Sequence, residues 1–231
     1  MCIRDSSRKI KLMAVYTRIN QNDLSLIEKN FKIGKIYSFS GIKKGIENTN
    51  YLIKTNKKKI ILTIFEKRVQ LKDLPFFMNL MFGLSKHKIK CPEPIKNKKG
   101  KYLFKIKSKT ACLVSFLEGK DKNQLTNKDC FQVGKNAALL HLAAKKLRLH
   151  RKNSLSVSSW GPLLNRIDKR INKLSNNLIE TMKTDLVDIE KKWPKNMPNG
   201  IIHSDLFIDN IFFYKKKYYG FIDFYFSAND F

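Results

Sequence analysis

Alternation of apolar and polar residues marks the first half of the chain. The runs YSFSG, NYLIKT and KIILTIF, between residues 35 and 65, have the two-residue period of strands, and Asn56 with the lysines at 57–59 predicts a hairpin turn between the last two runs. Two more strand-like runs lie at 102–106 and 111–116. We therefore expect a five-stranded antiparallel sheet with one covered face and one partly wet face.

A helical period marks residues 73–86, where apolar residues recur every three or four positions. These residues are Leu74, Phe77, Met78, Met81 and Leu84. Pro75 falls in the first turn, where its missing N–H costs nothing. The segment predicts the helix that covers the sheet, and a shorter helix is expected at 23–30, ahead of the first strand.

From Leu117 onward the pattern becomes helical. Thr126 predicts a helix N-cap, with Asp129 at the third helical position in a weaker form of the capping box. Behind this cap we expect a stripe of mostly small residues that a neighbouring element approaches closely: Cys130, Gly134, Ala137, His141 and Ala144. A long core helix is predicted from 161 to 193, with these residues facing inward: Leu164, Ile167, Ile171, Leu174, Leu178, Met182, Leu186 and Ile189.

The change of pattern predicts an α+β fold with two lobes. We expect residues 13–117 to form the N-terminal lobe and residues 118–231 to form the C-terminal lobe. Gly119 and the polar run up to Asn123 predict the hinge between them.

The two ends of the chain carry separate expectations. Residues 1–12 show no periodicity, and Met13 begins a stretch typical of an authentic start, so we interpret 1–12 as a non-native leader. The chain stops within the apolar stretch FYFSANDF, eight residues after Asp223. We therefore expect the C-terminal lobe to be incomplete.

The charge balance, taken alone, favours a polyanionic partner. The chain has 47 Lys+Arg against 19 Asp+Glu, a net charge of +28, which is typical of nucleic-acid-binding proteins. The lysines, however, cluster at predicted turns, at 57–59, 98–101 and 215–217, and most aromatic residues fall inside apolar strand and helix patterns. We expect no specific nucleic-acid partner and attribute the charge to codon bias; a basic nucleic-acid-binding module is the alternative from another class.

The cysteines argue against two kinds of site. Cys2, Cys91, Cys112 and Cys130 show no paired spacing, so neither a zinc site nor a disulfide framework is indicated. No apolar stretch approaches the roughly 18 residues that cross a bilayer, and the N-terminus lacks the hydrophobic block of a signal peptide. We expect a cytoplasmic protein without a membrane partner.

The segment GIIHSDLFIDNIFFYKKKYYGFIDF, residues 200–224, carries the candidate chemistry. His203, Asp205 and Asn210 follow the order His-x-Asp-x-x-x-x-Asn, and Asp223 follows a second hydrophobic run. Phosphoryl transfer to a hydroxyl needs one carboxylate to accept the proton, and a second carboxylate with an amide oxygen to hold Mg²⁺ against the phosphates. Strands predicted at 210–214 and 218–222 would bring the last two ligands to the same end of a hairpin. Each residue alone is more often a turn or cap residue; their combination favours a kinase.

This segment resembles the catalytic loop of the aminoglycoside phosphotransferase and choline kinase superfamily, and it is most similar to bacterial homoserine kinases. Further similar stretches are GIKKGIENTNYLIKT (41–55), ILTIFEKR (61–68), DLPFFMNLM (73–81), CPEPI (91–95) and VSFLEGK (114–120). The resemblance implies a two-lobed protein-kinase-like fold with a catalytic β-hairpin. It also implies ATP- and Mg²⁺-dependent phosphorylation of the side-chain hydroxyl of L-homoserine, a step of threonine synthesis; another small alcohol such as choline or an aminoglycoside is the alternative acceptor.

The resemblance assigns roles to single residues. Asp205 matches the catalytic aspartate, Asn210 the amide ligand of Mg²⁺, and Asp223 the carboxylate that bridges metal and phosphates. His203 matches a residue that buttresses the loop. For the nucleotide, the resemblance implies contacts from Gly41, Asn48, Thr49 and Asn50 in one loop and from Phe116, Leu117 and Glu118 in the linker.

One position departs from the pattern of the wider superfamily. Thr63 stands where protein kinases place a phosphate-pairing lysine on the third strand, a charge that threonine cannot supply. Lys67 and Arg68 are candidate replacements, although each is more simply a solvated charge at a strand end. Asp73 matches the position of the lysine's carboxylate partner, and its place in the first helical turn also suits a helix-dipole role. The sequence contains no readable motif for binding the acceptor, and Asn229 and Asp230 are named without one.

Overall fold

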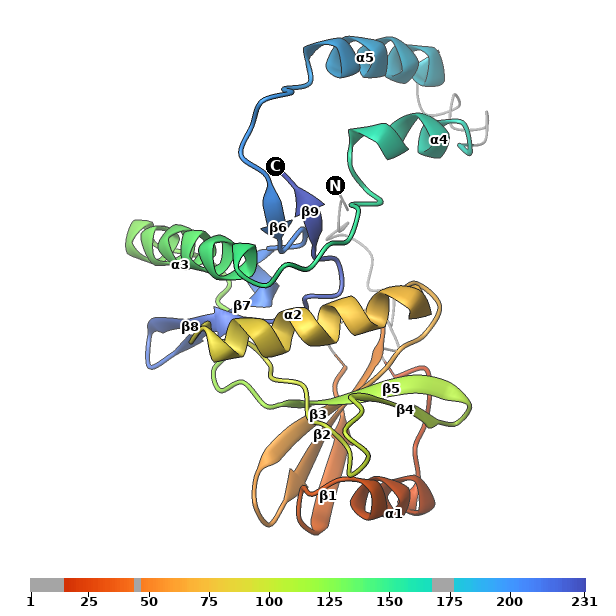
Figure 1. Cartoon of the computed structure of the whole chain (residues 1–231), viewed down its shortest axis with the longest axis vertical. Helices are drawn as coiled ribbons and strands as arrows, with labels where there is room; N and C mark the ends of the chain where they lie inside the picture. Colours follow the sequence, from red (N-terminus) through yellow and green to blue (C-terminus); the bar gives the residue numbers. More distant parts are fainter. Residues whose placement is uncertain (1–14, 44–46, 168–176) are drawn as a thin grey trace.

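The computed structural model describes residues 15–43, 47–167 and 177–231; the predicted leader at 1–12 lies outside these ranges. Its N-terminal half is built on the five-stranded antiparallel sheet that the sequence predicted, with strand order β1-β2-β3-β5-β4 (Figure 1). The strands are β1 Ile36–Gly41, β2 Thr49–Thr55, β3 Lys59–Ile64, β4 Leu103–Ile106 and β5 Lys109–Ser115.

The predicted hairpin turn joins β2 to β3. The Thr55 hydroxyl oxygen accepts hydrogen bonds from the backbone N–H groups of Lys57 and Lys58, at 3.2 and 3.0 Å. The Asn56 side-chain oxygen accepts from the N–H of Lys35 at 2.9 Å. These side chains satisfy backbone groups that a tight turn leaves without strand partners, which is why short polar residues occupy it.

Helices cover both faces of the sheet. Helix α2, Leu74–Lys86, packs its buried face on one side, together with Phe65 and Val114. Helix α1, Gln21–Asn30, places Leu24 and Ile27 in a second buried cluster with the opposite face of β3 and β5. The expectation of a partly wet face was therefore wrong along these central strands, because the short first helix closes that face.

In the described residues, the C-terminal half contains the helices α3, α4 and α5 and four short strands. The 3-10 turn η1, Leu71–Asp73, precedes α2 in the N-terminal half. The elements of the C-terminal half are α3 Asn127–Lys145, η2 Val157–Ser159, α4 Trp160–Leu164, α5 Leu178–Lys192, β6 Gly200–Ile202, η4 Ile208–Asn210, β7 Ile211–Tyr214, β8 Lys217–Phe221 and β9 Ala228–Asp230. β7 and β8 form an antiparallel hairpin, and β6 pairs with β9.

Helix α3 begins where the sequence predicted but turns a different face inward. Thr126 and Asp129 form the complete capping box, with each side chain accepting from the other's backbone N–H. The buried residues of its apolar face are Leu140, Ala143 and Ala144, whereas Cys130, Gly134 and His141 of the predicted stripe are exposed. The larger Leu140 and the alanine pair set the packing against α2 and β6.

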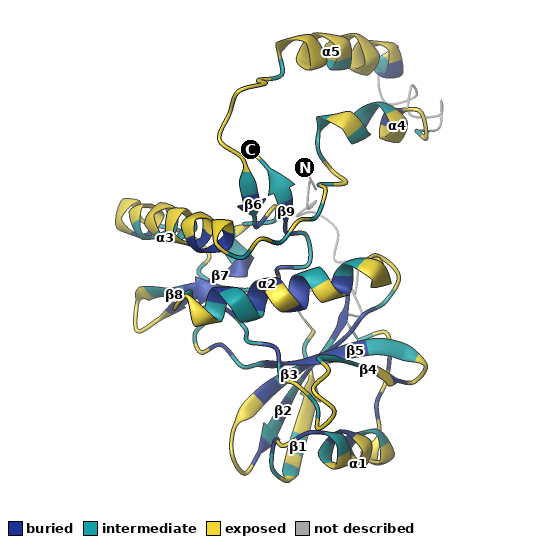
Figure 2. Ribbon diagram, viewed as in Figure 1, coloured by how far each residue is buried: buried dark blue, intermediate teal, exposed yellow. Residues whose placement is uncertain are grey.

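The long core helix predicted at 161–193 is not formed. It is divided into α4 and α5, with a turn at 165–167, and the predicted positions Ile171 and Leu174 lie outside the described residues. The two helices lie side by side, far from the sheet, and α5 is mostly exposed (Figure 2). The apolar residues of α5 recur with the predicted helical period, but Ile179 is the only buried residue of this helix.

The linker between the halves depends on a glycine. Gly119 has φ +105°, and a Cβ there would lie 2.6 Å from the Phe213 carbonyl oxygen, so a larger residue meets both strain and backbone. The close approach lets Lys120 exchange two backbone hydrogen bonds with Phe213, at 3.0 and 2.8 Å. The linker is thereby fixed to the β7–β8 hairpin.

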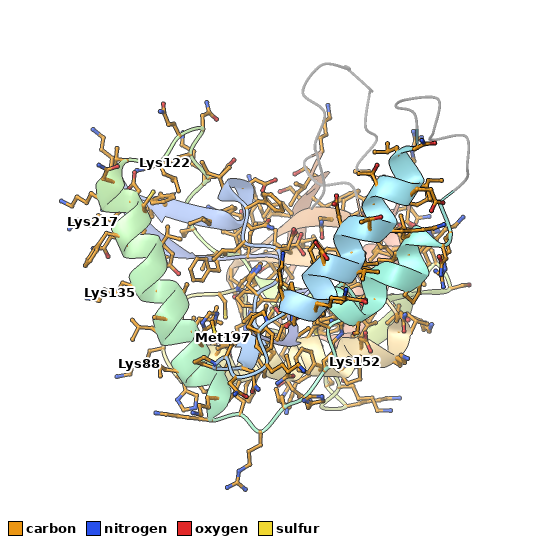
Figure 3. All side chains as sticks on the ribbon, turned by 90° about the horizontal axis from the view of Figure 1, so that it is seen from above. Lys88, Lys122, Lys135, Lys152, Met197 and Lys217 are labelled. Carbon is orange, nitrogen blue, oxygen red and sulfur yellow. The ribbon has the colours of Figure 1, made fainter. Side chains whose placement is uncertain are left out.

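The lysine clusters decorate turns, as their spacing predicted. The lysines at 57–59, 98–101 and 215–217 are all exposed, and Lys135 and Lys217 project outward from the ribbon (Figure 3). In the described ranges, no helix combines the length and the apolar character needed to cross a bilayer.

Candidate active site

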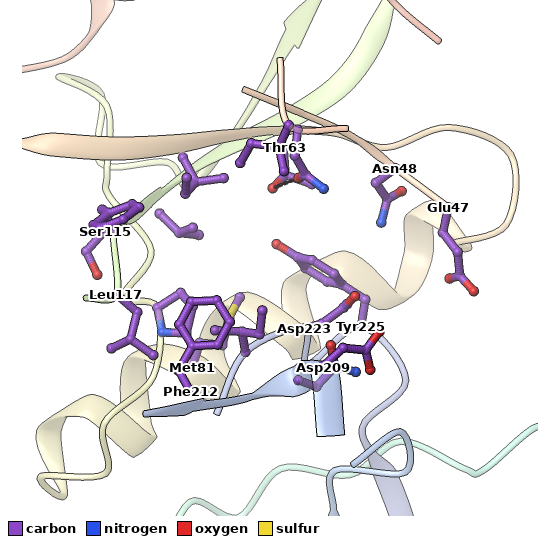
Figure 4. A pocket seen from close by; sticks show the side chains of 18 of the residues that line it. Glu47, Asn48, Thr63, Met81, Ser115, Leu117, Asp209, Phe212, Asp223 and Tyr225 are labelled. Atoms are coloured by element: carbon purple, nitrogen blue, oxygen red, sulfur yellow. Dashed lines mark hydrogen bonds between the residues drawn. The ribbon is translucent and has the colours of Figure 1, made fainter. Parts of the chain in front are cut away.

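A cavity of about 240 Å³ lies between the sheet and the C-terminal half. In Figure 4 its upper wall comes from the sheet and carries Asn48 and Thr63, while its lower wall carries Asp209, Asp223 and Tyr225 (Figure 4). The cavity therefore takes residues from both halves of the chain.

The two ends of the cavity differ in chemistry. Ser115, Leu117, Met81 and Phe212 lie toward the linker end, whereas Glu47, Asp209 and Asp223 lie toward the other end. An apolar slot suits a planar heterocycle, and a cluster of carboxylates suits a cation. The cavity thus has the polarity that a nucleoside phosphate with a bound metal ion requires.

The loop between β6 and β7 places Asp205 on the cavity wall. The Asn210 Nδ2 donates to the Asp205 carbonyl oxygen at 2.8 Å and to its carboxylate Oδ2 at 3.2 Å. Asn210 is 6% exposed, so these bonds orient both the loop backbone and the carboxylate. The Asn210 amide thereby holds the candidate catalytic group in place, and Asn210 itself lines the same cavity.

The β7–β8 hairpin brings Asn210 and Asp223 together, as the sequence predicted. Its register pairs Ile211 with Phe221, and the N–H of Ile222 donates to the Asn210 carbonyl oxygen at 3.0 Å. The two candidate metal ligands consequently lie at the same end of the hairpin, beside Asp205.

Two residues in the site have left-handed backbone conformations. Ser204 has φ 65° and Asp223 has φ 63°, a region that costs a residue with a side chain roughly 1–3 kcal/mol. Such conformations persist where surrounding contacts enforce them.

His203 supports this floor from behind. Its ring is 3% exposed, and its Nε2 lies 2.8 Å from the Ile222 carbonyl oxygen. Burial lowers the pKa of the imidazole to about 4, against the smaller opposing effect of that hydrogen bond. His203 is therefore neutral at pH 7 and does not line the cavity, which fits a buttressing role.

Asp223 has the most perturbed carboxyl group of the site. Its side chain opens on to the cavity, while protein atoms crowd it on the other sides. This loss of bulk water, followed by the negative charges of Glu47 and Asp205, raises the pKa of Asp223 to about 7. A bound cation would relieve the same repulsion.

The oxygen donors around Asp223 fit a hard divalent cation. Within the described residues there is no closed group of three His, Cys, Asp or Glu side chains. Mg²⁺-type sites do not need one, because such ions are held by one or two carboxylates, waters and substrate phosphates. Asp223 and Asn210 supply protein oxygens on one wall, and the nucleotide would supply the rest.

The loop after β1 divides between cavity and core; its residues 44–46 lie outside the described part. Asn48 and Asn50 line the cavity, and Figure 4 shows the Asn48 side-chain nitrogen directed into it (Figure 4). Thr49 points the other way: its hydroxyl donates to Glu66 at 2.7 Å and accepts from the N–H of Thr17 at 3.1 Å. Thr49 and Gly41 are thus not among the lining residues.

The linker residues divide in a similar way. Phe116 and Leu117 line the apolar end of the cavity. Glu118 does not, and its carboxylate lies 3.6 Å from the ammonium group of Lys59 on the molecular surface.

Among the described residues, no lysine lines the cavity to replace the one that protein kinases carry at the position of Thr63. Its hydroxyl donates to the Asn50 side-chain oxygen at 2.8 Å and interacts with the hydroxyl of Tyr225. Arg68 forms an ion pair with Glu47 at the cavity rim and stacks on Phe226 at 5.1 Å. Lys67 is exposed.

Several cavity residues escaped the sequence analysis: Glu47, Asp121, Asp209 and Tyr225. Three of them adjoin predicted residues, since Glu47 precedes Asn48, Asp209 precedes Asn210, and Tyr225 follows Asp223 by two positions. The available signal was scarcity. The chain has only 19 acidic residues, and two of them, Glu47 and Asp209, stand directly beside the predicted site residues Asn48 and Asn210.

The two acceptor candidates lie outside the cavity wall and form hydrogen bonds with the segment after α3. Asn229 accepts through its side-chain oxygen from the N–H of Arg151 at 2.8 Å. Asp230 accepts from Asn153 at 2.6 Å. Neither residue lines the cavity.

Comparison with known proteins assigns the family. The model of a family described as the phosphotransferase enzyme family matches residues 38–231. The chain belongs to this phosphotransferase family. It is 42% identical over 219 residues to a homoserine kinase of Nitrobacter hamburgensis and 40% identical over 219 residues to a homoserine kinase of Sinorhizobium medicae. Both matches cover 95% of the chain and 67% of the relative.

Solved phosphotransferases share the fold. A spectinomycin phosphotransferase in complex with ADP and spectinomycin has a TM-score of 0.64 and 17% identity, over 92% of this chain and 71% of that chain. An amicoumacin kinase in complex with AMP-PNP, Ca²⁺ and its substrate has a TM-score of 0.69 and 16% identity, over 92% and 66% of the two chains. The chain is thus a phosphotransferase with a protein-kinase-like fold.

Proposed function

We propose that this phosphotransferase transfers the γ-phosphoryl group of ATP, with Mg²⁺, to the side-chain hydroxyl of L-homoserine. The observation that carries the proposal is the identity of 42% over 219 residues to a curated homoserine kinase. The solved neighbours, at 17% identity and below, support the fold and leave the acceptor to the closer relatives.

Asp205 is proposed as the catalytic residue. Its carboxylate accepts the proton of the acceptor hydroxyl as that oxygen bonds to the γ-phosphorus and the bond to the leaving ADP oxygen breaks. Asn210, through its 3.2 Å contact with the carboxylate, keeps the acceptor oxygen of Asp205 turned to the cavity. Positioning of this kind is the main contribution a protein makes to phosphoryl transfer.

Asp223 and Asn210 are proposed to hold the metal ion, which when bound neutralises charge on the phosphates. Asn48 and Asn50 present amide groups on the opposite wall, where they can donate to phosphate oxygens. Thr63 supports this arrangement by fixing the Asn50 amide at 2.8 Å. Phe116 and Leu117 line the slot proposed for adenine. Gly41, Thr49 and Glu118, for which the resemblance also implies nucleotide contacts, do not line the cavity.

We also propose that the two lobes meet at residues 117/118 and that the protein is cytoplasmic. Gly119 and its backbone exchange with Phe213 support a boundary in the linker. Cys91 and Cys112 are free and buried thiols, which fits the reducing cytoplasm.

A panel of alcohols tests the acceptor. Purified protein is supplied with Mg²⁺-ATP and, separately, L-homoserine, L-serine, choline, 1-aminopropan-2-ol or an aminoglycoside, and ADP release is followed. We expect kcat/KM for L-homoserine to exceed that of every other acceptor by about tenfold or more, since a site shaped for one polar substrate rejects poorer fits. A higher kcat/KM for another alcohol would replace homoserine in the proposal.

A further inference from the structure

A half-buried ion pair joins the two halves of the chain behind the cavity. Arg151 Nε donates to the Asp73 carboxylate at 2.7 Å. Asp73 is the N-cap residue of α2 in the N-terminal half, and Arg151 follows α3 in the C-terminal half. The side chains are 14% and 18% exposed, so solvent screens this pair far less than a surface pair.

The same guanidinium reaches the segment that follows Asp223. Its Nη1 donates to the Ser227 carbonyl oxygen at 3.1 Å and lies 3.4 Å from that of Phe226. The backbone of Arg151 is fixed to that segment as well, because the N–H of Asn229 donates to its carbonyl oxygen at 2.7 Å. Arg151 therefore contacts the Asp223 segment through both its main chain and its side chain.

Packing restricts the arginine further. The guanidinium carbon lies 5.1 Å from the centroid of the Phe77 ring, which is fully buried on α2. A planar group with several fixed donors can hold a carboxylate and carbonyl oxygens at once, whereas a lysine ammonium on a flexible stem cannot. The geometry at this point is specific for arginine.

The partner of Asp73 differs from the one expected by resemblance. Its carboxylate pairs with Arg151 across the two halves, and the third strand presents Thr63. Arg151 thus links α2 to the segment that follows Asp223, and the third strand contributes no charge to this link.

We propose that Arg151 is a positioning residue, which fixes the Asp223 segment to helix α2 and so keeps the Asp223 carboxylate aimed at the bound cation. Asp223 has the left-handed φ of 63°, a conformation that needs outside contacts to persist. Arg151 fixes Phe226 and Ser227, three and four residues later, and so adds to the contacts of His203 and Asn210 with Ile222 on the other side of Asp223. The inference rests on the proposed role of Asp223 in cation binding and is independent of the acceptor.

Calorimetry of a non-hydrolysable ATP analogue, titrated at a series of Mg²⁺ concentrations, tests the proposal. Arg151→Met removes the charge and the fork but keeps a chain over Phe77, Arg151→Lys keeps the charge alone, and Asp73→Asn keeps the shape of the carboxylate. We expect Arg151→Met to raise the Mg²⁺ concentration for half-maximal binding by about 10- to 100-fold, as loss of a residue behind a metal ligand does. Arg151→Lys should resemble Arg151→Met more than the unaltered protein.

Lys122→Met is the matched control. Lys122 forms a comparable ion pair with Asp129, at 2.8 Å and with side chains 28% and 8% exposed, and its ammonium group lies over the Phe213 ring. Its loss should lower thermal stability while changing the Mg²⁺ requirement by less than about twofold. Asp73→Asn added to Arg151→Met should cause little further loss, because the two residues act through one contact.

A Mg²⁺ requirement in Arg151→Met that matches Lys122→Met would overturn the proposal, as would fully additive effects of Asp73→Asn and Arg151→Met. If Arg151→Met does not fold, Arg151→Lys and Asp73→Asn decide, and unchanged Mg²⁺ dependence in both would also overturn it. Failure of L-homoserine as acceptor leaves this measurement unaffected. Absence of Mg²⁺-dependent nucleotide binding in the unaltered chain would overturn both this inference and the proposed function.

Discussion

His203 donates a hydrogen bond of 2.8 Å from its Nε2 to the carbonyl oxygen of Ile222, the residue immediately before Asp223. A carbonyl oxygen only accepts, so the proton is on Nε2, and Nδ1 has no hydrogen-bond partner in the described part of the chain. This single contact ties the loop that carries Asp205 to the strand end that carries Asp223. It also makes the site sensitive to acid.

The folded state should lose stability through His203 as the pH falls. Its pKa is lowered from 6.5 to about 4 in the folded state, so the unfolded chain takes up a proton first, and the loss develops below pH 6.5 and is complete near pH 4. Urea unfolding at pH 7 and pH 5 should show about 2 kcal/mol less pH dependence in His203→Gln than in the unaltered protein. The contribution of Asp223, which has the opposite sign, is common to both proteins and cancels. Equal pH dependence in the two proteins would contradict the burial of a neutral His203.

Metal affinity should depend on the protonation of Asp223. The pKa of this carboxyl is raised to about 7, so in the metal-free protein it is mostly protonated below that pH, and a cation must displace the proton. Apparent Mg²⁺ affinity in the presence of the ATP analogue should rise about tenfold from pH 6 to pH 8 and then level off. Asp223→Ala should weaken metal-dependent nucleotide binding and turnover together. Unaltered Mg²⁺ dependence in that variant would remove Asp223 from the metal site.

Nucleic-acid binding should be weak and non-specific despite the net charge of +28. The lysine clusters at 57–59, 98–101 and 215–217 lie on separate exposed turns. We expect binding to duplex and single-stranded DNA without sequence preference and with affinity that falls steeply as salt is added, as counterion release requires. Sub-micromolar, sequence-selective binding at physiological salt would show that the charge has a function of its own.

The sequence predicted the N-terminal sheet and the catalytic hairpin well because their signals are local. Alternation and turn residues define β2, β3 and β5 over a few positions each, and the hairpin that unites Asn210 and Asp223 is contiguous in sequence. The wet face was predicted wrongly because its cover, α1, precedes the sheet and packs on it only through tertiary contacts.

Periodicity could not define which helical face meets the core. On α3, Phe131 and Leu142 are 69% and 62% exposed, whereas Ala143 and Ala144 are buried. The large apolar side chains of this helix therefore do not mark its buried face. On α5 the apolar period is genuine, yet Met182 and Ile189 remain 37% and 40% exposed. A pattern identifies an amphipathic helix but not the element that covers it.

The site shows the same division between local and distant signals. Asp205, Asn210 and Asp223 follow a spacing that can be recognised along the chain. Tyr225 also lines the cavity, but its partner there, Thr63, is distant in sequence. Within β2, strand alternation turns Thr49 to the opposite face from Asn50, so Thr49 does not line the cavity although it lies between two residues that do. Arg151 has no local motif at all, since its partners lie near residues 73 and 227.

The turnover of Asp205→Asn, measured beside its affinity for the ATP analogue, tests the proposed chemistry most directly. Asparagine keeps the size of the side chain and its place beside Asn210 but cannot accept the acceptor's proton. We predict that kcat falls by roughly a hundredfold or more, while the Kd for the Mg²⁺-nucleotide changes little, because Asp205 positions the hydroxyl rather than the nucleotide. Turnover above about a tenth of the unaltered value would contradict the assignment of Asp205 as the catalytic residue.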